Sequence, residues 1–305
     1  MNTTARLDAR TLTAIAIALL TWSSAYASIA YALASFTPGE VAFARLAMGS
    51  VCFAGLMLIR RAPLPVRRDW LRLAVLGVVG LSTYHLCLNY AETRIASGTA
   101  SILIALTPAA TAAVSAIWLR ERLSARMLTG LGVALVGVML VVLASGKQVT
   151  FQPMAALVLV CVLVTAVFFV GQKPLFDRNG MLGVTAFTFF AGTLGALPFA
   201  GGIGSALRLA PWSHIAALGY LGMGPTFVGY LAWNIALRKV SASQLASFLY
   251  FSPPIAVLIG WLWLHEQPHA VTLVGGVITV AGVALANGRR RALPSPPPVA
   301  TCEHH

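Results

Sequence analysis

Apolar residues occur along the chain in ten runs, most of them close to 20 residues long and separated by short polar segments. An α-helix of about that length crosses the hydrocarbon core of a bilayer. The pattern therefore predicts ten transmembrane helices, with no room between them for a soluble domain. The predicted spans are 11–31, 39–59, 70–90, 96–118, 127–144, 154–171, 182–202, 213–237, 243–264 and 270–287.

Composition supports lipid as the solvent of this chain. Hydrophobic residues make up 58% of the sequence and charged residues only 10%, and the mean hydropathy is +0.83. Soluble domains carry roughly 25% charged residues. The run FLYFSPPIAVLIGWLWLHE at 248–266 contains two adjacent prolines. Lipid tolerates them better than water does, because neighbouring helices and hydroxyl side chains satisfy the freed backbone groups.

The positive charges lie mainly on one side of the predicted membrane. If the N-terminus is inside, 17 of the 21 Lys and Arg residues fall on the cytoplasmic side, three fall outside, and Arg45 lies within a span. The positive-inside rule then predicts that both termini are cytoplasmic. The net charge of +13 is thus expected to meet anionic lipid head groups and not nucleic acid.

The two halves of the chain repeat one another. With a constant offset of 145 residues, the stretch YAETRIASGTASILIALTPAATAAVSAIWLRERL from residue 90 aligns without gaps with IALRKVSASQLASFLYFSPPIAVLIGWLWLHEQP from residue 235. Pro108 meets Pro253, and Glu121 meets Glu266. Because each half has five spans, an odd number, the halves must lie in the membrane with opposite orientations. The predicted parts are a cytoplasmic N-terminus (1–10), two five-helix repeats (11–147 and 148–287) and a proline-rich, disordered cytoplasmic tail (288–305).

Inverted repeats are the architecture of secondary transporters, which bind substrate near the midplane between the halves. The segments TPGEVAFARL at 37–46, ALTPAATAAVSAIWLRERL at 105–123 and YFSPPIAVLIGWLWLHEQ at 250–267 resemble the drug/metabolite transporter superfamily, EamA type. Within it, the chain is most similar to bacterial exporters of aromatic and other hydrophobic amino acids. The resemblance implies an inner-membrane efflux carrier. It also implies a central cavity walled by the first, third, fourth, sixth, eighth and ninth spans.

Aromatic and polar side chains on those spans are the candidates for contacting substrate. Aromatic walls stack on aromatic substrates, and amides and hydroxyls can meet amino and carboxyl groups. The alternatives for the aromatic residues are ordinary packing and a belt at the membrane interface. The predicted substrate-binding residues are Trp22, Tyr26, Tyr84, His85, Asn89, Phe168, Phe169, Tyr230, Trp233, Asn234, Gln244, Ser247 and Tyr250.

Pro108 and Pro253 are predicted hinges. Each proline removes one backbone donor and frees the carbonyl four residues earlier, at Ile104 and Leu249. Such a carbonyl can bind a substrate ammonium, or the helix can bend there as the halves rock. A static kink is the alternative.

Two ionisable residues inside spans need separate interpretation. His85 is expected to carry a proton or to hydrogen-bond a substrate carboxylate; a neutral, buried imidazole bonded to a carbonyl is the alternative. Arg45 is expected to snorkel or to pair with a helix C-terminus, without meeting substrate. On this interpretation the cavity holds no fixed charge.

Transport without a cofactor is the predicted activity. No H-E-x-x-H, Ser-His-Asp or Asp-rich motif occurs in the spans, which disfavours an intramembrane enzyme and a metal site. No nucleotide-binding loop of the G-x-x-x-x-G-K-[ST] type is present. No acid falls in the middle third of a span, so facilitated diffusion is favoured over proton exchange through His85.

The expected substrate is a zwitterion with an apolar side chain, such as an aromatic amino acid. A lipophilic cation held by aromatic faces and exported with proton coupling is the alternative. The chain is expected to act as a monomer, since it holds both halves. Small residues also permit close packing of the fifth and tenth spans within one chain: Gly130, Gly132, Gly137, Gly275, Gly276 and Gly282.

Overall fold

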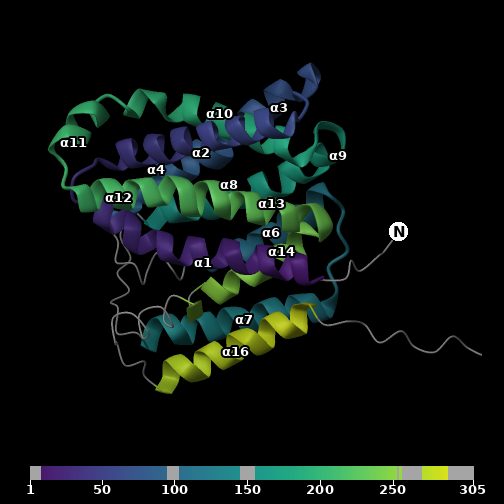
Figure 1. Ribbon diagram of the computed structural model, residues 1–305. Coiled ribbons are helices and arrows are strands. Elements are labelled where there is room, and N and C mark those ends of the chain that lie inside the picture. The colour runs from purple at the N-terminus through teal and green to yellow at the C-terminus, as the bar shows by residue number, and fades with distance from the viewer. Residues whose placement is uncertain (1–7, 95–102, 145–154, 253, 256–269, 288–305) are drawn as a thin grey trace, which may run out of the picture.

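A computed structural model describes residues 8–94, 103–144, 155–252, 254–255 and 270–287 of the chain. Regular structure within these residues is entirely helical. Figure 1 shows the long helices running side by side, with α7 (Ala125–Ala144) and α16 (Ala270–Asn287) as a pair along one edge.

The first half is built from six α-helices and two irregular helical stretches in the described residues. After α1 and α2, the third predicted span is a continuous helix that changes its winding along its length. The elements are α1 (Ala9–Ala32), α2 (Pro38–Arg60), the 3₁₀ turn η1 (Arg67–Asp69), α3 (Trp70–Val75), the π-helix η2 (Leu76–Ser82), α4 (Thr83–Glu92), α6 (Thr107–Trp118) and α7.

The second half repeats this order, with the eighth predicted span again changing its winding. The elements are α8 (Ala155–Gln172), η3 (Lys173–Leu175), α9 (Phe176–Asn179), α10 (Met181–Ala196), η4 (Leu197–Phe199), α11 (Ile203–Leu209), α12 (Trp212–Leu221), the π-helix η5 (Gly222–Gly229), α13 (Tyr230–Lys239), α14 (Ala242–Ser247), η6 (Phe248–Phe251) and α16.

Seven helical stretches of the described residues are long and apolar enough to cross a membrane, and Ala125–Val141 forms a shorter apolar helix. Together they match eight of the ten predicted spans to within a few residues, apart from the sixth, which continues through η3 and α9. The predicted spans 96–118 and 243–264 lie partly outside the described residues. The short helix α11 was not predicted. The seven stretches are Ala9–Ala32, Pro38–Arg60, Arg67–Glu92, Ala156–Asn179, Met181–Phe199, Trp212–Lys239 and Ala270–Asn287.

The start of α2 explains part of the TPGE motif. Oγ1 of Thr37 accepts a hydrogen bond from the backbone nitrogen of Glu40 at 3.3 Å, and the Glu40 carboxylate accepts one from the Thr37 nitrogen at 2.8 Å. This reciprocal capping box satisfies two backbone donors that the first turn of a helix leaves free. Pro38 follows at the first helical position, where its missing N–H costs nothing. The motif thus fixes where α2 begins.

The two π-helices occupy equivalent places in the two halves. Gly77 of η2 and Gly222 of η5 are separated by the same 145 residues as the sequence repeat. The π-helix η2 packs against α10, and η5 packs against α2. Each half therefore places its third span against the second span of the other half. This cross-packing fixes the halves to one another and was not predicted.

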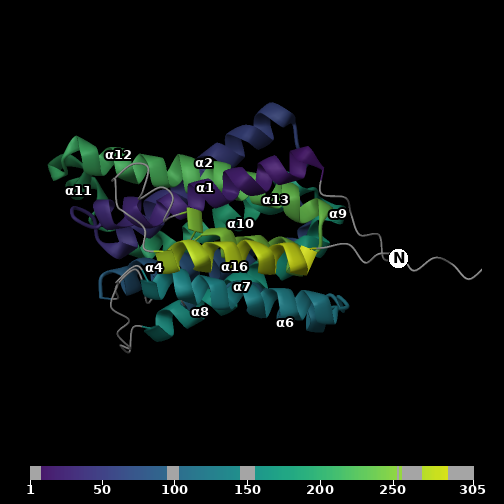
Figure 2. The same ribbon diagram turned by 90° about the horizontal axis from the view of Figure 1, so that it is seen from below.

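The pair α7 and α16 packs closely because of glycine. A Cβ on Gly137 would lie 2.5 Å from the backbone nitrogen of Thr279, and one on Gly275 would lie 2.8 Å from the carbonyl oxygen of Gly137. Figure 2 shows the two helices running alongside each other from a second direction. The predicted close packing of the fifth and tenth spans within one chain is confirmed. Gly132 and Gly276 take no part in it, because a Cβ on either would meet nothing within 4 Å.

Candidate functional site

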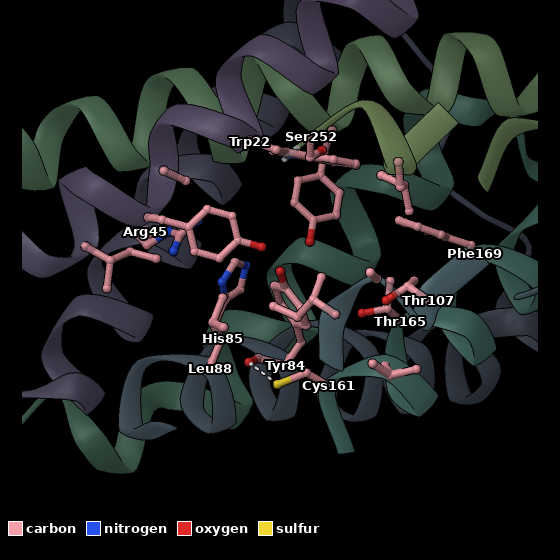
Figure 3. A pocket seen from close by; sticks show the side chains of 18 residues that line it. Trp22, Arg45, Tyr84, His85, Leu88, Thr107, Cys161, Thr165, Phe169 and Ser252 are labelled. Atoms are coloured by element: carbon pink, nitrogen blue, oxygen red, sulfur yellow. Dashed lines mark hydrogen bonds between the residues drawn. The ribbon is translucent and has the colours of Figure 1, made fainter. Parts of the chain in front are cut away.

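A cavity of about 120 Å³ lies between the two halves. Every span that the family resemblance implied as a wall contributes a side chain to it, and α2 contributes one more. Figure 3 shows the cavity from close by. One lining residue from each implied span is Trp22, Tyr84, Thr107, Phe169, Tyr230 and Leu249.

Equivalent positions of the two halves face the same cavity. His85 and Tyr230 are separated by 145 residues, as are Ile104 and Leu249, and all four line the cavity. A third such pair, Thr107 and Ser252, lines it as well. The repeat therefore brings matched positions together around one space.

Trp22 is the centre of an aromatic cluster on one side of the cavity. Its ring stacks on Phe169 with centroids 6.2 Å apart, and it meets Tyr230 edge-on at 5.2 Å. Its Nε1 donates a hydrogen bond to the carbonyl oxygen of Pro225 at 2.9 Å. Pro225 lies inside η5, so the irregular helix of the second half fixes the ring of the first.

Six of the predicted residues line the cavity: Trp22, Tyr26, Tyr84, His85, Phe169 and Tyr230. Phe168 and Trp233 instead pack behind this wall. The ring of Phe168 lies 6.2 Å from Tyr230, and that of Trp233 lies 5.0 Å from Trp22. Both are almost fully buried, so they support the wall without forming its surface.

The predicted amides Asn89 and Asn234 hold helices together away from the cavity surface. Nδ2 of Asn89 donates to the carbonyl oxygen of Pro38 at 3.0 Å, which ties α4 to the start of α2. Asn234 accepts a hydrogen bond from Gln172 at 3.1 Å and donates one to Thr185 at 2.9 Å. These bonds join α13 to α8 and α10. Asn89 and Asn234 are separated by 145 positions and so occupy equivalent places in the two halves. Both join neighbouring helices.

The predicted residues Gln244, Ser247 and Tyr250 are also absent from the cavity lining in the described residues. Oγ of Ser247 accepts from Nδ2 of Asn287 at 2.8 Å and donates to the carbonyl of Gln244 at 2.7 Å, so it ties α14 to α16. Tyr250 belongs to an apolar cluster with α7 and α16. The sequence located these residues on the correct span but could not give the direction they face.

Arg45 differs from expectation. Only 3% of it is exposed, and it lines the cavity from α2. Its Nε donates to Oγ1 of Thr226 at 3.3 Å, and its Nη1 is buried without a hydrogen-bond partner among the described residues. The expectation that Arg45 snorkels or pairs with a helix C-terminus is wrong. The expectation that the cavity holds no fixed charge is wrong as well.

His85 is fully buried beside Arg45 (Figure 3). Neither ring nitrogen has a hydrogen-bond partner among the described residues. Its ring meets that of Tyr84 edge-on at 5.1 Å. The alternative of an imidazole bonded to a neighbouring carbonyl is not observed in the described part of the chain, and the ring remains available to a ligand.

Cys161 is a further lining residue that sequence reasoning did not single out. Its Sγ lies 3.5 Å from the carbonyl oxygen of Tyr84 (Figure 3), and both residues border the cavity. A lone cysteine in an apolar span gives no signal by itself.

The predicted hinges lie next to cavity-lining residues. Pro108 occupies the first turn of α6, directly after a turn at residues 105–106, and Ile104 lines the cavity just before it. A proline in the first turn removes no intrahelical bond. Pro253 is outside the described residues. Its neighbour Ser252 lines the cavity, and both hinges stay predictions.

Comparisons with known proteins bear on the family of the chain. The model of the EamA-like transporter family matches residues 9–143 and again residues 152–288. A probable terminal-alkyne amino-acid exporter of Streptantibioticus cattleyicolor is 33% identical, covering 93% of this chain and 96% of that protein. A pseudopaline exporter of Pseudomonas aeruginosa is 28% identical, covering 90% and 95%.

Two further matches bear on location and fold. An inner membrane transporter of Escherichia coli is 26% identical, covering 83% of this chain and 86% of that protein. A solved crystal structure covers 92% of this chain and 98% of its own at 21% identity, with a TM-score of 0.72. It shows that the fold is shared. The two matches to one family model indicate a duplicated repeat. The chain is a multi-pass membrane transporter and not an enzyme, and it belongs to the EamA-like transporter family.

Proposed function

We propose that this transporter exports aromatic or other hydrophobic amino acids, and related amphipathic metabolites, from the cytoplasm across the inner membrane. The observation that carries the proposal is the composition of the cavity wall. Trp22, Phe169 and Tyr230 offer apolar ring faces, and Arg45 offers a positive charge. A hydrophobic amino acid has an apolar side chain for the ring faces and a carboxylate for the positive charge. The amino-acid exporter among the relatives supports the same substrate class.

A lipophilic cation is the alternative substrate, and Arg45 argues against it. No acidic side chain lines the cavity among the described residues, whereas one guanidinium does. Like charges in a water-poor site repel each other strongly. Aromatic faces attract a cation by about 0.5–2 kcal/mol, and the repulsion from Arg45 opposes that attraction.

Alternating access between two inverted five-helix repeats, together ten spans, is the proposed mechanism. The pairs of equivalent residues around the cavity, His85 with Tyr230 and Ile104 with Leu249, support a substrate site on the pseudo-two-fold axis. The distribution of Lys and Arg supports cytoplasmic termini.

Facilitated diffusion is the proposed energetics, with proton exchange through His85 as the alternative. The cavity wall holds no carboxylate among the described residues, so a carboxylate relay lacks its parts. His85 is buried, and both of its ring nitrogens lack partners among the described residues, as a proton carrier needs. A pH gradient imposed on reconstituted vesicles separates the two. If the gradient strongly accelerates transport and His85→Gln abolishes that acceleration, facilitated diffusion is wrong.

The test of substrate class compares two compounds in proteoliposomes. We expect the parent to export phenylalanine faster than tetraphenylphosphonium. Trp22→Ala and Tyr84→Ala should each lower the rate of phenylalanine export by at least about tenfold, since each removes an aromatic side chain from the cavity wall. Trp212→Ala is the matched control, because Trp212 is 83% exposed and absent from the cavity lining. If both cavity variants export phenylalanine at the parental rate while export of the cation collapses, the amino-acid proposal is wrong.

A further inference from the structure

We propose that Arg45 is the anchor for the substrate's carboxylate and that it fixes which way the substrate lies in the cavity. The inference rests on the proposed function and deepens it. It assigns a polar end and an apolar end to the site, and it names the chemical group that the polar end binds. Nothing in the sequence pattern of α2 indicated this role.

The burial of Arg45 requires a partner that the described residues do not fully provide. Nε is bonded to Thr226, but Nη1 is buried with no partner among the described residues. An unpaired cation in a low-dielectric site costs several kcal/mol. Charged residues retained inside a membrane protein mark substrate or ion sites. Because the side chain borders the cavity, a ligand there can supply the missing acceptor.

Guanidinium chemistry selects the ligand group. Its N–H donors form a planar fork that matches the two oxygens of a carboxylate, and such charge-assisted bonds are about twice as strong as neutral ones. His85 lies beside Arg45 with both nitrogens unpartnered among the described residues, so it can add a further donor to the same anion. An amino acid or another monocarboxylate fits this end of the cavity.

The remaining wall fixes the direction of the substrate. Figure 3 shows Arg45 and His85 toward one end of the cavity and Phe169 toward the other, with Trp22 between them. A carboxylate held at Arg45 therefore directs an apolar side chain toward Trp22 and Phe169. Arg45 lies near the start of α2 and Phe169 near the end of α8. With the termini inside, the carboxylate points outward and the side chain points inward.

Glu92 is the competing partner for Arg45. Its two carboxylate oxygens are buried without hydrogen-bond partners among the described residues. Yet no ion pair within 4.0 Å joins the two side chains: the ion pairs of the described residues are those of Asp69 and Asp8. Glu92 therefore does not hold the guanidinium, and Nη1 of Arg45 is left for a ligand.

The experiment measures how well unlabelled compounds inhibit phenylalanine counterflow in proteoliposomes. The probes are phenylalanine and phenylalaninamide, which keeps the ammonium and the ring but replaces the carboxylate with a neutral amide. We expect the parent to prefer phenylalanine by at least about tenfold, as a charge-assisted bond would give. Arg45→Gln should reduce this preference to about one while the amide binds within about threefold of its parental strength.

Two further variants keep the outcome decisive. Arg45→Lys retains the charge without the planar fork and should show an intermediate preference, and it covers the case in which Arg45→Gln does not fold. Glu92→Gln in the Arg45→Gln background tests the structural role. If that double variant regains the parental preference, Arg45 serves only to balance Glu92 and the proposal is overturned.

The results also separate this inference from the proposed function. A parent protein that binds neither compound overturns the proposed function. A parent that transports phenylalanine, together with a folded Arg45→Gln or Arg45→Lys variant of unchanged preference, overturns the anchor alone. Loss of the preference in Arg45→Gln, with the amide still bound, supports it.

Discussion

The two halves of this transporter share a backbone plan but present different chemistry to the cavity. Where the first half places His85, the second places Tyr230, and where the first half places Tyr84, the second has Gly229. A Cβ on Gly229 would lie 2.7 Å from Nε1 of Trp22, so the ring of Trp22 takes up the space. The second span of the first half supplies Arg45, whereas α10 contains no charged residue.

The comparison separates the features that the fold requires from the side chains that contact the substrate. Features that recur in both halves concern the backbone and packing: the π-helices η2 and η5, and the buried amides Asn89 and Asn234. The features that differ lie in the cavity lining, beside matched pairs of similar chemistry such as Ile104 with Leu249. A symmetric scaffold with an asymmetric lining has a polar end and an apolar end, which suits a substrate that has both.

Replacement of the equivalent glycines Gly77 and Gly222 should give the largest effect, a loss of stability that differs between the two halves. A Cβ on Gly77 would collide with the backbone carbonyl of Thr188, which cannot move alone, whereas one on Gly222 would meet only side-chain atoms of Met48, its terminal methyl and its Cβ among them. We expect Gly77→Ala to lower the free energy of unfolding by about 2–3 kcal/mol, as overpacking does, and Gly222→Ala by a smaller amount, about 1–2 kcal/mol. Denaturation in detergent measures both, and equal losses would contradict the comparison.

Glu121 should give the next largest effect, because it joins the two halves. Its carboxylate accepts hydrogen bonds from the backbone nitrogens of Ala242 and Ser243, at 3.1 and 3.4 Å, and from the Ser243 hydroxyl at 2.6 Å. It thereby caps α14. We expect Glu121→Ala to cost about 1–2 kcal/mol, as loss of a cap does. Ser243→Ala completes a double-mutant cycle, and additive losses would show that the two residues act independently.

Gly229 should have a smaller effect, confined to substrate binding. Gly229→Ala adds a Cβ that displaces the Trp22 ring and its bond to Pro225. We expect phenylalanine to bind about five- to tenfold more weakly, roughly the loss of one neutral hydrogen bond. Gly132→Ala is the control, since a Cβ there meets nothing within 4 Å. Unchanged affinity in Gly229→Ala would mean that the position of Trp22 is not set by this glycine.

Asp8 should have the smallest effect. This exposed side chain accepts hydrogen bonds from Thr11 and from Lys239 at the end of α13, and these bonds hold the pKa of its carboxyl below the ordinary value. The stability that ionised Asp8 contributes is therefore fully present at pH values above the pKa of Asp8 in the unfolded chain. It is lost only as the pH falls through the lowered pKa of the folded chain. Asp8→Asn should leave transport unchanged from neutral pH to about pH 5, well above the ordinary Asp pKa. A change in transport at neutral pH would contradict this.

The sequence predicted the spans because apolar length is a local property. Span boundaries followed from the length and composition of each run, and the repeat followed from Pro108, Glu121 and their counterparts. The identity of the wall spans came from the family resemblance. Each of these features can be read from one segment or from two aligned segments.

Side-chain direction could not be predicted in the same way, because it depends on packing between distant helices. Arg45 faces the cavity because α2 packs against η5, where Thr226 accepts its hydrogen bond. Tyr250 faces α7 and α16 instead. The π-helices were missed because a single extra residue per turn leaves no mark in an apolar run. Glycine and proline in GMGPT at 222–226 are compatible with a regular helix, a kink or a π-helix.

Counterflow of labelled phenylalanine in proteoliposomes containing only this protein tests the central claim most directly. Vesicles loaded with unlabelled phenylalanine should accumulate the label transiently, with a rate that saturates as the outside concentration rises and that Trp22→Ala reduces by at least about tenfold. This is the behaviour of a carrier whose aromatic cavity binds the substrate. A rate that rises linearly without saturation, or one that Trp22→Ala leaves unchanged, would contradict the account.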